Sequence, residues 1–215
     1  MIDIQSSDIS TAGAYVCING LYPFAIGTQP HNGCIPLIRL GGHREGHETG
    51  WQCAVREVYE EAHLCIQSLP PSITYLSDGD HIEANLKEIQ WVHEADQAIP
   101  LLVVAYHRQS RILLSLMYLA HADKPPRPSA EIKGLLLLDR ENIQRLCREP
   151  LTLEHYLSSG GKAILNYEFD MSLILEPFIQ LRLFSRILSV QSENMAAAQH
   201  GAQSDEGPQW IAAQR

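Results

Sequence analysis

Short apolar runs separated by turn residues recur through the first two thirds of the chain. Runs rich in Val, Ile, Leu and Tyr and bounded by Gly, Pro or Asn are typical of β-strands. The expected strands are Ala14–Asn19, Phe24–Thr28, Cys34–Leu40, Ser72–Leu76, Lys87–Val92, Pro100–His107, Ile112–His121 and Gly134–Leu138. The polar residues Met1 to Gly13 lack such a pattern, so we expect a loose segment before the first strand.

The segment from Gly50 to His63 has helical periodicity instead. Its apolar stripe consists of Ala54, Val55, Val58 and Ala62. This stripe predicts a helix with one buried face, and Thr49 is a suitable N-cap for it. A second helix is expected over Arg140–Arg148. Strands with a few interposed helices predict an α/β or α+β domain with a mixed sheet.

Beyond residue 150 the pattern changes again. Apolar residues recur near helical spacing between Leu151 and Val190, which predicts a C-terminal helical extension. From Ser192 onward Ala, Gln, Ser and Gly dominate, and we expect a disordered tail. The sequence therefore predicts a main domain over residues 1–150, a helical extension over 151–191 and a tail over 192–215.

The balance of charges bears on the partners of the protein. Its 215 residues include 25 Asp and Glu against 16 Lys and Arg, a formal net charge of −9. This excess repels nucleic-acid backbones and no Lys/Arg-rich run offsets it, so we expect no polymeric DNA or RNA partner. The chain shows no secretory signal and no apolar stretch long enough for a membrane span, so we expect a cytoplasmic protein.

Three carboxylates lie together on the predicted helix. Glu57 and Glu61 are four residues apart and Glu60 is three residues from Glu57, so all three side chains project from one side. Like charges this close destabilise a bare helix, whereas a bound hard cation such as Mg²⁺ reverses that effect. The helix therefore carries a candidate site for a divalent metal.

The Gly41-Gly42 pair stands at the end of an expected strand, just before this helix. Glycine lets the backbone approach a ligand closely. A strand, a glycine-containing loop and an acidic helix together predict a cradle for a metal and a phosphate. In such a cradle a metal-bound water becomes the nucleophile when a carboxylate takes its proton.

These residues follow the spacing of a known motif. The chain resembles the Nudix family, whose box is Gly, five residues, Glu, seven residues and then Arg-Glu-U-x-Glu-Glu-x-Gly-U, where U is a bulky aliphatic residue. The matching residues are Gly42, Glu48, Arg56, Glu57, Val58, Glu60, Glu61 and Leu64. One position departs, because His63 stands where the family has Gly. Since this helix-end residue often adopts positive φ, the change should cost on the order of 1 kcal/mol.

The resemblance implies a role for each polar residue of the motif. Glu57, Glu60 and Glu61 would bind divalent metals or serve as the base. The Gly42 backbone would contribute to the metal or phosphate site. Arg56 would orient a glutamate by ion pairing, and so belongs with the three glutamates in the catalytic set.

Three further residues are candidates for substrate binding. By the same resemblance, Glu48 would hold the loop or reach a metal. Arg44 lies beside this loop in the sequence and could reach a phosphate, with simple solvation as the alternative. The family often recruits another acidic residue from a later loop, and Glu131, after the Pro-rich segment, is the candidate. The alternative for Glu131 is a plain surface residue.

The resemblance implies a Nudix-type α/β/α sandwich with a mixed β-sheet, followed by the C-terminal helical extension. It also implies an Mg²⁺-dependent or Mn²⁺-dependent hydrolase that cleaves a phosphoanhydride (pyrophosphate) bond in a nucleoside diphosphate linked to another moiety. Two alternatives stay open: a nucleoside triphosphate pyrophosphohydrolase, and a non-catalytic Nudix-like domain that senses a nucleotide. The expected partner is a small nucleotide-type substrate, and a homodimer through the extension is open.

Overall fold

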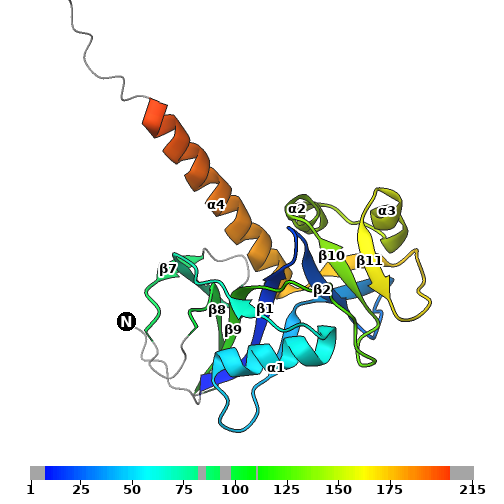
Figure 1. Cartoon of the computed structure of the whole chain (residues 1–215), viewed down its shortest axis with the longest axis horizontal. Coiled ribbons are helices and arrows are strands. Elements are labelled where there is room, and N and C mark those ends of the chain that lie inside the picture. The colour runs from blue at the N-terminus through cyan, green and yellow to red at the C-terminus, as the bar shows by residue number, and fades with distance from the viewer. Residues whose placement is uncertain (1–7, 82–85, 93–97, 110, 204–215) are drawn as a thin grey trace, which may run out of the picture.

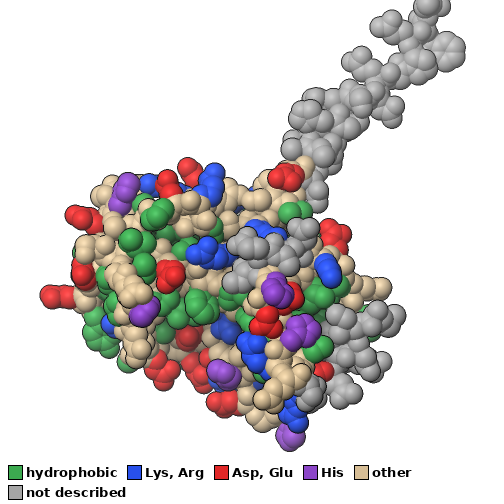
Figure 2. Space-filling view, turned by 180° about the vertical axis from the view of Figure 1, so that it is seen from behind, with side chains coloured by type: hydrophobic (Ala, Val, Ile, Leu, Met, Phe, Trp, Pro, Cys, Tyr) green, Lys and Arg blue, Asp and Glu red, His purple; other side chains and the backbone are tan. Residues whose placement is uncertain are grey.

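The computed structural model of the chain describes residues 8–81, 86–92, 98–109 and 111–203. Within these ranges the backbone forms two β-sheets of mixed direction with helices packed beside them (Figure 1). The predicted α/β class with mixed β-structure is therefore confirmed. On the face seen in Figure 2, acidic and basic side chains are interspersed, so the negative charge is not gathered there in one block.

The first sheet contains seven of the described strands. They are β1 (Ile9–Cys17), β4 (Leu40–His43), β5 (Gln67–Ser68), β6 (Thr74–Asp78), β7 (Lys87–Ile89), β8 (Leu102–Arg108) and β9 (Arg111–His121). Their order is β4-β1-β9-β8-β6-β7, with β5 paired to β9. The pairs β1–β9 and β6–β8 are parallel, and the other neighbours are antiparallel.

The N-terminal part of β1 corrects one prediction. Residues 1–7 lie outside the described residues, but Ile9 to Gly13 belong to β1 and not to a loose lead-in. Ile9 and Ala12 are buried there, while the polar side chains between them hydrogen-bond to β9. The polar residues of this segment do not show the apolar pattern of a strand, yet they form one because their hydroxyl groups hydrogen-bond to the neighbouring strand.

The second sheet contains five of the described strands. They are β2 (Tyr22–Ile26), β3 (Cys34–Ile38), β10 (Gly134–Leu138), β11 (Lys162–Leu165) and β12 (Ile174–Pro177), in the order β11-β10-β2-β3-β12. The helical extension predicted over 151–191 is present in α3 (Leu153–Ser158) and α4 (Ile179–Gln203), but the prediction is wrong for β11 and β12. Their backbones pair with β10 and β3, and backbone pairing of this kind leaves little trace in side-chain spacing.

The helices are α1 (Gly50–Ala62), α2 (Arg140–Arg148), α3 (Leu153–Ser158) and α4 (Ile179–Gln203). Figure 1 shows α1 lying across the first sheet, whereas α4 starts against the body and extends away from it. α4 continues past residue 192, where a disordered tail was expected, and residues 204–215 lie outside the described residues. The domain division at residue 150 stays a prediction. None of the described helices combines the length and apolar character that a membrane span needs.

Strand β1 lies between two apolar cores. Alternate residues point to opposite faces of a strand, so Ala14 and Val16 pack in the core of α1 while Tyr15 joins the core of α4. The Tyr15 ring stacks on Phe184 with the centroids 3.9 Å apart, and its hydroxyl donates to the Gln180 carbonyl at 2.7 Å. The strand thus holds α1, and the carboxylates on it, in a fixed position.

Candidate active site

Helix α1 begins with a complete capping box. The Thr49 hydroxyl accepts from the backbone N–H of Gln52 at 3.2 Å, and the Gln52 side chain accepts from the Thr49 N–H at 2.9 Å. The N-cap predicted at Thr49 is therefore confirmed. The buried side of the helix includes Cys53, Ala54 and Val58, which leaves the glutamates on the remaining surface.

The guanidinium of Arg56 gathers three carboxylates. It contacts Glu48 through Nε at 2.7 Å and through a second nitrogen at 3.0 Å. A third nitrogen lies 2.9 Å from both Glu57 and Glu60. Arg56 also donates to the His43 carbonyl at 2.9 Å, which ties the loop before α1 to the helix. The ion pairing expected of Arg56 is present in the structure.

This network shifts the ionisation of its members. The hydrogen bonds from Arg56 lower the pKa of Glu48, against a smaller opposing effect of burial. The hydrogen bond with Glu48 is also the main cause of a raised pKa for Arg56, with Glu57 and Glu60 contributing. Both groups therefore keep their charges over the physiological range, and Glu48 serves as an anchor for the arginine.

Glu61 is held apart from this network. Its carboxylate accepts from the Gly41 N–H at 2.8 Å and forms no salt bridge with any described residue. Burial raises the pKa of Glu61 to about 7, while the Gly41 hydrogen bond and the charge of Arg39 act in the opposite direction. Glu61 is thus a buried carboxylate whose ionised form has too little compensating positive charge.

The Gly41-Gly42 pair lies within β4 and does not simply end a strand as expected. It pairs with Gly13 and Ala12 of β1. Gly41 has φ of 143°, and a Cβ there would overlap the β1 backbone. A Cβ on Gly42 would overlap the carboxylate of Glu57. Close approach of the backbone therefore requires glycine at position 41, whereas a side chain at position 42 would displace the flexible Glu57 carboxylate.

The chemistry of these carboxylates fits a divalent cation, but their present arrangement is not a finished metal site. Glu61 is largely buried and has no salt bridge with any described residue, and the missing side chain of Gly42 leaves room beside Glu57. Among the described residues, however, no group of three or more His, Cys, Asp or Glu is placed to hold a metal. Arg56 contacts Glu57 and Glu60 through one carboxylate oxygen each, which leaves the second oxygen of each residue for a cation.

Two of the candidates for substrate binding, Arg44 and Glu131, lie on segments next to α1. Arg44 donates to the backbone carbonyl of Glu48 at 3.1 Å, within the loop before α1. Glu131 is exposed, and its charge is close enough to contribute to the raised pKa of Glu61. The segment before it is fixed to α1, since the Ser129 N–H donates to the Glu61 carbonyl at 2.9 Å. The structure thus brings Glu131 toward the carboxylates.

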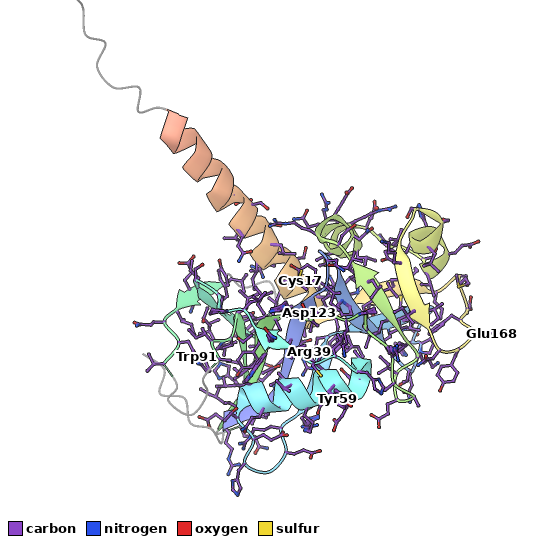
Figure 3. The ribbon with its side chains drawn as sticks, viewed as in Figure 1. Cys17, Arg39, Tyr59, Trp91, Asp123 and Glu168 are labelled. Atoms are coloured by element: carbon purple, nitrogen blue, oxygen red, sulfur yellow. The ribbon has the colours of Figure 1, made fainter. Side chains whose placement is uncertain are left out.

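Arg39 is a candidate that motif spacing does not reveal. It is only 7% exposed, and its guanidinium donates to the Gly41 carbonyl. Its Nε has no hydrogen-bond partner in the described part of the chain. Burial lowers the pKa of Arg39, and the nearby Glu61 is the largest opposing influence. Figure 3 labels it between α1 and β1. The only sequence signal is one charged residue in an apolar run before two glycines.

His63 ends α1 in the left-handed conformation, with φ of 52° and ψ of 36°. Its N–H donates to the Tyr59 carbonyl at 2.9 Å, and its ring Nδ1 lies 3.0 Å from the Arg127 carbonyl oxygen. The positive φ expected at this position is confirmed. Glycine could make neither this contact with Arg127 nor the contact of the histidine ring with the Tyr59 ring, whose centroid lies 5.9 Å away.

Comparison with known proteins finds only distant similarities, all of them to solved structures. No protein-family profile matches the chain, and no curated protein matches it. A NUDIX family hydrolase from Clostridium perfringens is 17% identical, covering 62% of this chain and 82% of its own, with a TM-score of 0.41. An Ap4A hydrolase from C. elegans is 16% identical, covering 64% and 84%, also with a TM-score of 0.41.

A MutT NUDIX hydrolase from Burkholderia pseudomallei is 19% identical, covering 69% of this chain and 92% of its own, with a TM-score of 0.37. Similarities this distant do not decide the activity of the chain. A functional assignment has to rest on the residues of the site.

Proposed function

We propose that this protein is a Nudix-type metal-dependent hydrolase that cleaves a phosphoanhydride bond in a nucleoside diphosphate linked to another moiety. The observation that carries the proposal is the buried Glu61 carboxylate, which the Gly41 backbone holds beside the Arg56 network. Burial of this carboxylate is only partly offset by the Gly41 hydrogen bond and the charge of Arg39, so its presence next to Glu57 and Glu60 favours a site built for positive charge.

In the proposed site Glu57, Glu60 and Glu61 would hold Mg²⁺ or Mn²⁺, with the Gly42 backbone contributing a carbonyl oxygen. When bound, the ion supplies positive charge for substrate phosphates and lowers the pKa of a bound water. It would also compensate the buried charge of Glu61. The magnesium site and the nucleotide-type substrate are thus parts of one proposal.

The residues around the carboxylates keep them in position. Glu48 anchors Arg56 through two hydrogen bonds, so the guanidinium stays in place when Glu57 or Glu60 turns away from it. Arg44 stands on the loop beside this network and is proposed to contact a substrate phosphate. Glu131 is proposed to add a further carboxylate from the opposite side of Glu61.

A nucleotide-sensing domain is the second candidate. It is favoured by the ion pairs of Arg56, because among the described residues no group of three or more His, Cys, Asp or Glu is placed to hold a metal. A sensor has no need for a metal centre, and in it the Arg56 network would be a permanent structural element.

The experiment is a panel of nucleotide sugars, dinucleotides and nucleoside triphosphates assayed with Mg²⁺ or Mn²⁺. It compares the wild type with Glu61→Gln and with Glu154→Gln, an exposed glutamate of α3 that serves as control. We expect turnover of at least one class, a loss of about a hundredfold in Glu61→Gln, and no change in the control. Turnover of triphosphates alone would favour the triphosphate pyrophosphohydrolase.

Two results would contradict the proposal. Tight nucleotide binding without turnover of any compound would favour the nucleotide-sensing domain. Full activity of Glu61→Gln would contradict a catalytic role for Glu61. A homodimer and a cytoplasmic location belong to the same proposal, and sedimentation of the purified chain would test the first.

A further inference from the structure

A hollow of about 420 Å³ lies at the C-terminal end of α1. Its lining residues are Tyr59, His63, Cys65, Lys124, Pro125 and Arg127. This lining contains a lysine, an arginine and a histidine and no Asp or Glu, although the chain as a whole carries a net charge of −9. The hollow is therefore a local concentration of positive charge on an acidic protein.

The backbone that carries these basic side chains is fixed to the helix. The Arg127 N–H donates to the Ala62 carbonyl at 2.9 Å, and the Ser129 N–H donates to the Glu61 carbonyl at 2.9 Å. On the other side, the His63 ring contacts the Arg127 carbonyl oxygen. These three links hold the loop against α1, so the hollow is a built feature of the fold.

Basic residues near a helix C-terminus often serve only to balance the helix dipole. Here the carbonyls of Glu61 and Ala62 already accept from the loop backbone, and that of Tyr59 accepts from the His63 N–H. Lys124 and Arg127 form no salt bridge with any described residue. Their charges are therefore available to a ligand.

Tyr59 gives the hollow an aromatic side. Its side chain is 52% exposed, and Figure 3 labels it on the side of α1 away from the strands. Glu57 and Glu61 are each turned about 160° around the helix from Tyr59, so the hollow opens on a different face of α1 from these carboxylates. An exposed ring beside two free cations matches a nucleotide, since bases stack on aromatic rings and phosphates pair with Lys and Arg.

We propose that this hollow binds the nucleoside-phosphate part of a nucleotide, with the phosphate between Lys124 and Arg127 and the base against Tyr59. None of the three glutamates lines the hollow, so this inference goes beyond the proposed function and does not rest on it. His63, the one departure from the motif, then forms a wall of the subsite.

The test measures binding of ADP by calorimetry in the presence of EDTA, so that no metal contributes. The variants are Tyr59→Ala and the double variant Lys124→Gln/Arg127→Gln. Matched controls are Tyr167→Ala, which removes a ring that is 55% exposed, and Lys162→Gln, which removes an exposed charge on β11. We expect each hollow variant to weaken ADP binding at least tenfold, the controls to match the wild type, and wild-type affinity to fall with added salt.

Failure of this inference is distinguishable from failure of the proposed function. ADP binding that persists in both hollow variants, or that is absent without metal, would overturn the subsite whether or not the protein hydrolyses nucleotides. ADP binding lost in the hollow variants and kept in Glu61→Gln would establish it, even in a protein without turnover.

Discussion

Glu61 is the residue for which the structure makes the most specific pH prediction. Its folded-state pKa is raised to about 7, while an unfolded glutamate titrates near ~4.3. Its burial therefore costs nothing below the unfolded pKa, and stability is lost as the pH rises through about 7. We expect Glu61→Gln to stabilise the metal-free protein by about 2 to 3 kcal/mol at pH 8 and by much less at pH 5.

Thermal melts in EDTA at the two pH values measure this effect, with Glu154→Gln as the exposed control. Adding Mg²⁺ at pH 8 should stabilise the wild type more than Glu61→Gln, because the ion compensates the same buried charge. A lower melting temperature for Glu61→Gln at pH 8 would show that the carboxylate is well compensated in the folded protein and would remove the argument for a cation.

Gly42 supports a second prediction about a single residue. A methyl group there overlaps the Glu57 carboxylate, so Gly42→Ala must displace Glu57 from its present position. We expect hydrolysis with Mg²⁺ to fall at least tenfold while the fold persists. The control is Gly46→Ala in the same loop, which has φ of 51° and open space around it. That variant should lose about 1 kcal/mol of stability and keep its activity. Equal activity of the two variants would show that Gly42 has no role in the catalytic site.

Among the elements, α1 is the one whose position is best predicted from the sequence. Its capping residue Thr49 and its apolar stripe are local signals, and the carboxylate spacing follows from helix geometry alone. The buried Arg39 could not be predicted in this way. Its burial and its position near Glu61 depend on how β3 and β4 meet α1, and no spacing along the chain encodes that meeting.

Strands β4, β11 and β12 escaped prediction for a related reason. β4 contains two glycines, which are poor strand formers, and it exists because these glycines allow close approach to β1. β11 and β12 are four residues each and complete the two ends of an existing sheet. Their conformation is decided by tertiary pairing, which overrides weak local preference.

The end of α1 supports a prediction about His63. Its left-handed φ of 52° disfavours any side chain, whereas its ring gains contacts with Arg127 and Tyr59. Comparing His63→Gly with His63→Ala isolates the first effect, because both variants lose the ring. We expect the glycine variant to be more stable than the alanine variant by about 1 kcal/mol, measured by chemical denaturation. Equal stabilities would show that the backbone relaxes out of the left-handed region at no cost.

At the scale of the whole molecule, Phe184 joins the two sheets. Its ring stacks on Tyr15 of β1 at 3.9 Å and meets Tyr22 of β2 edge-on at 5.1 Å. Phe184 is 1% exposed, so Phe184→Ala should destabilise the protein by about 3 to 5 kcal/mol. The control Phe178→Ala removes a ring that is 50% exposed, and should cost less than about 1 kcal/mol.

The same variant tests whether residues 151–191 form a separate extension, as the predicted boundary at residue 150 implies. In a Trp210→Phe background, tryptophan fluorescence follows the core that packs against α1, because Trp51 packs edge-on against Tyr118 of β9 and Trp91 packs against the same core. Far-UV circular dichroism follows both sheets. Since β11 and β12 pair with strands from the first 150 residues, we expect both signals to change in one transition in the wild type and in Phe184→Ala. If part of the circular dichroism signal were lost at a lower denaturant concentration than the fluorescence signal, the C-terminal segment would unfold on its own. That result would support a domain boundary at residue 150.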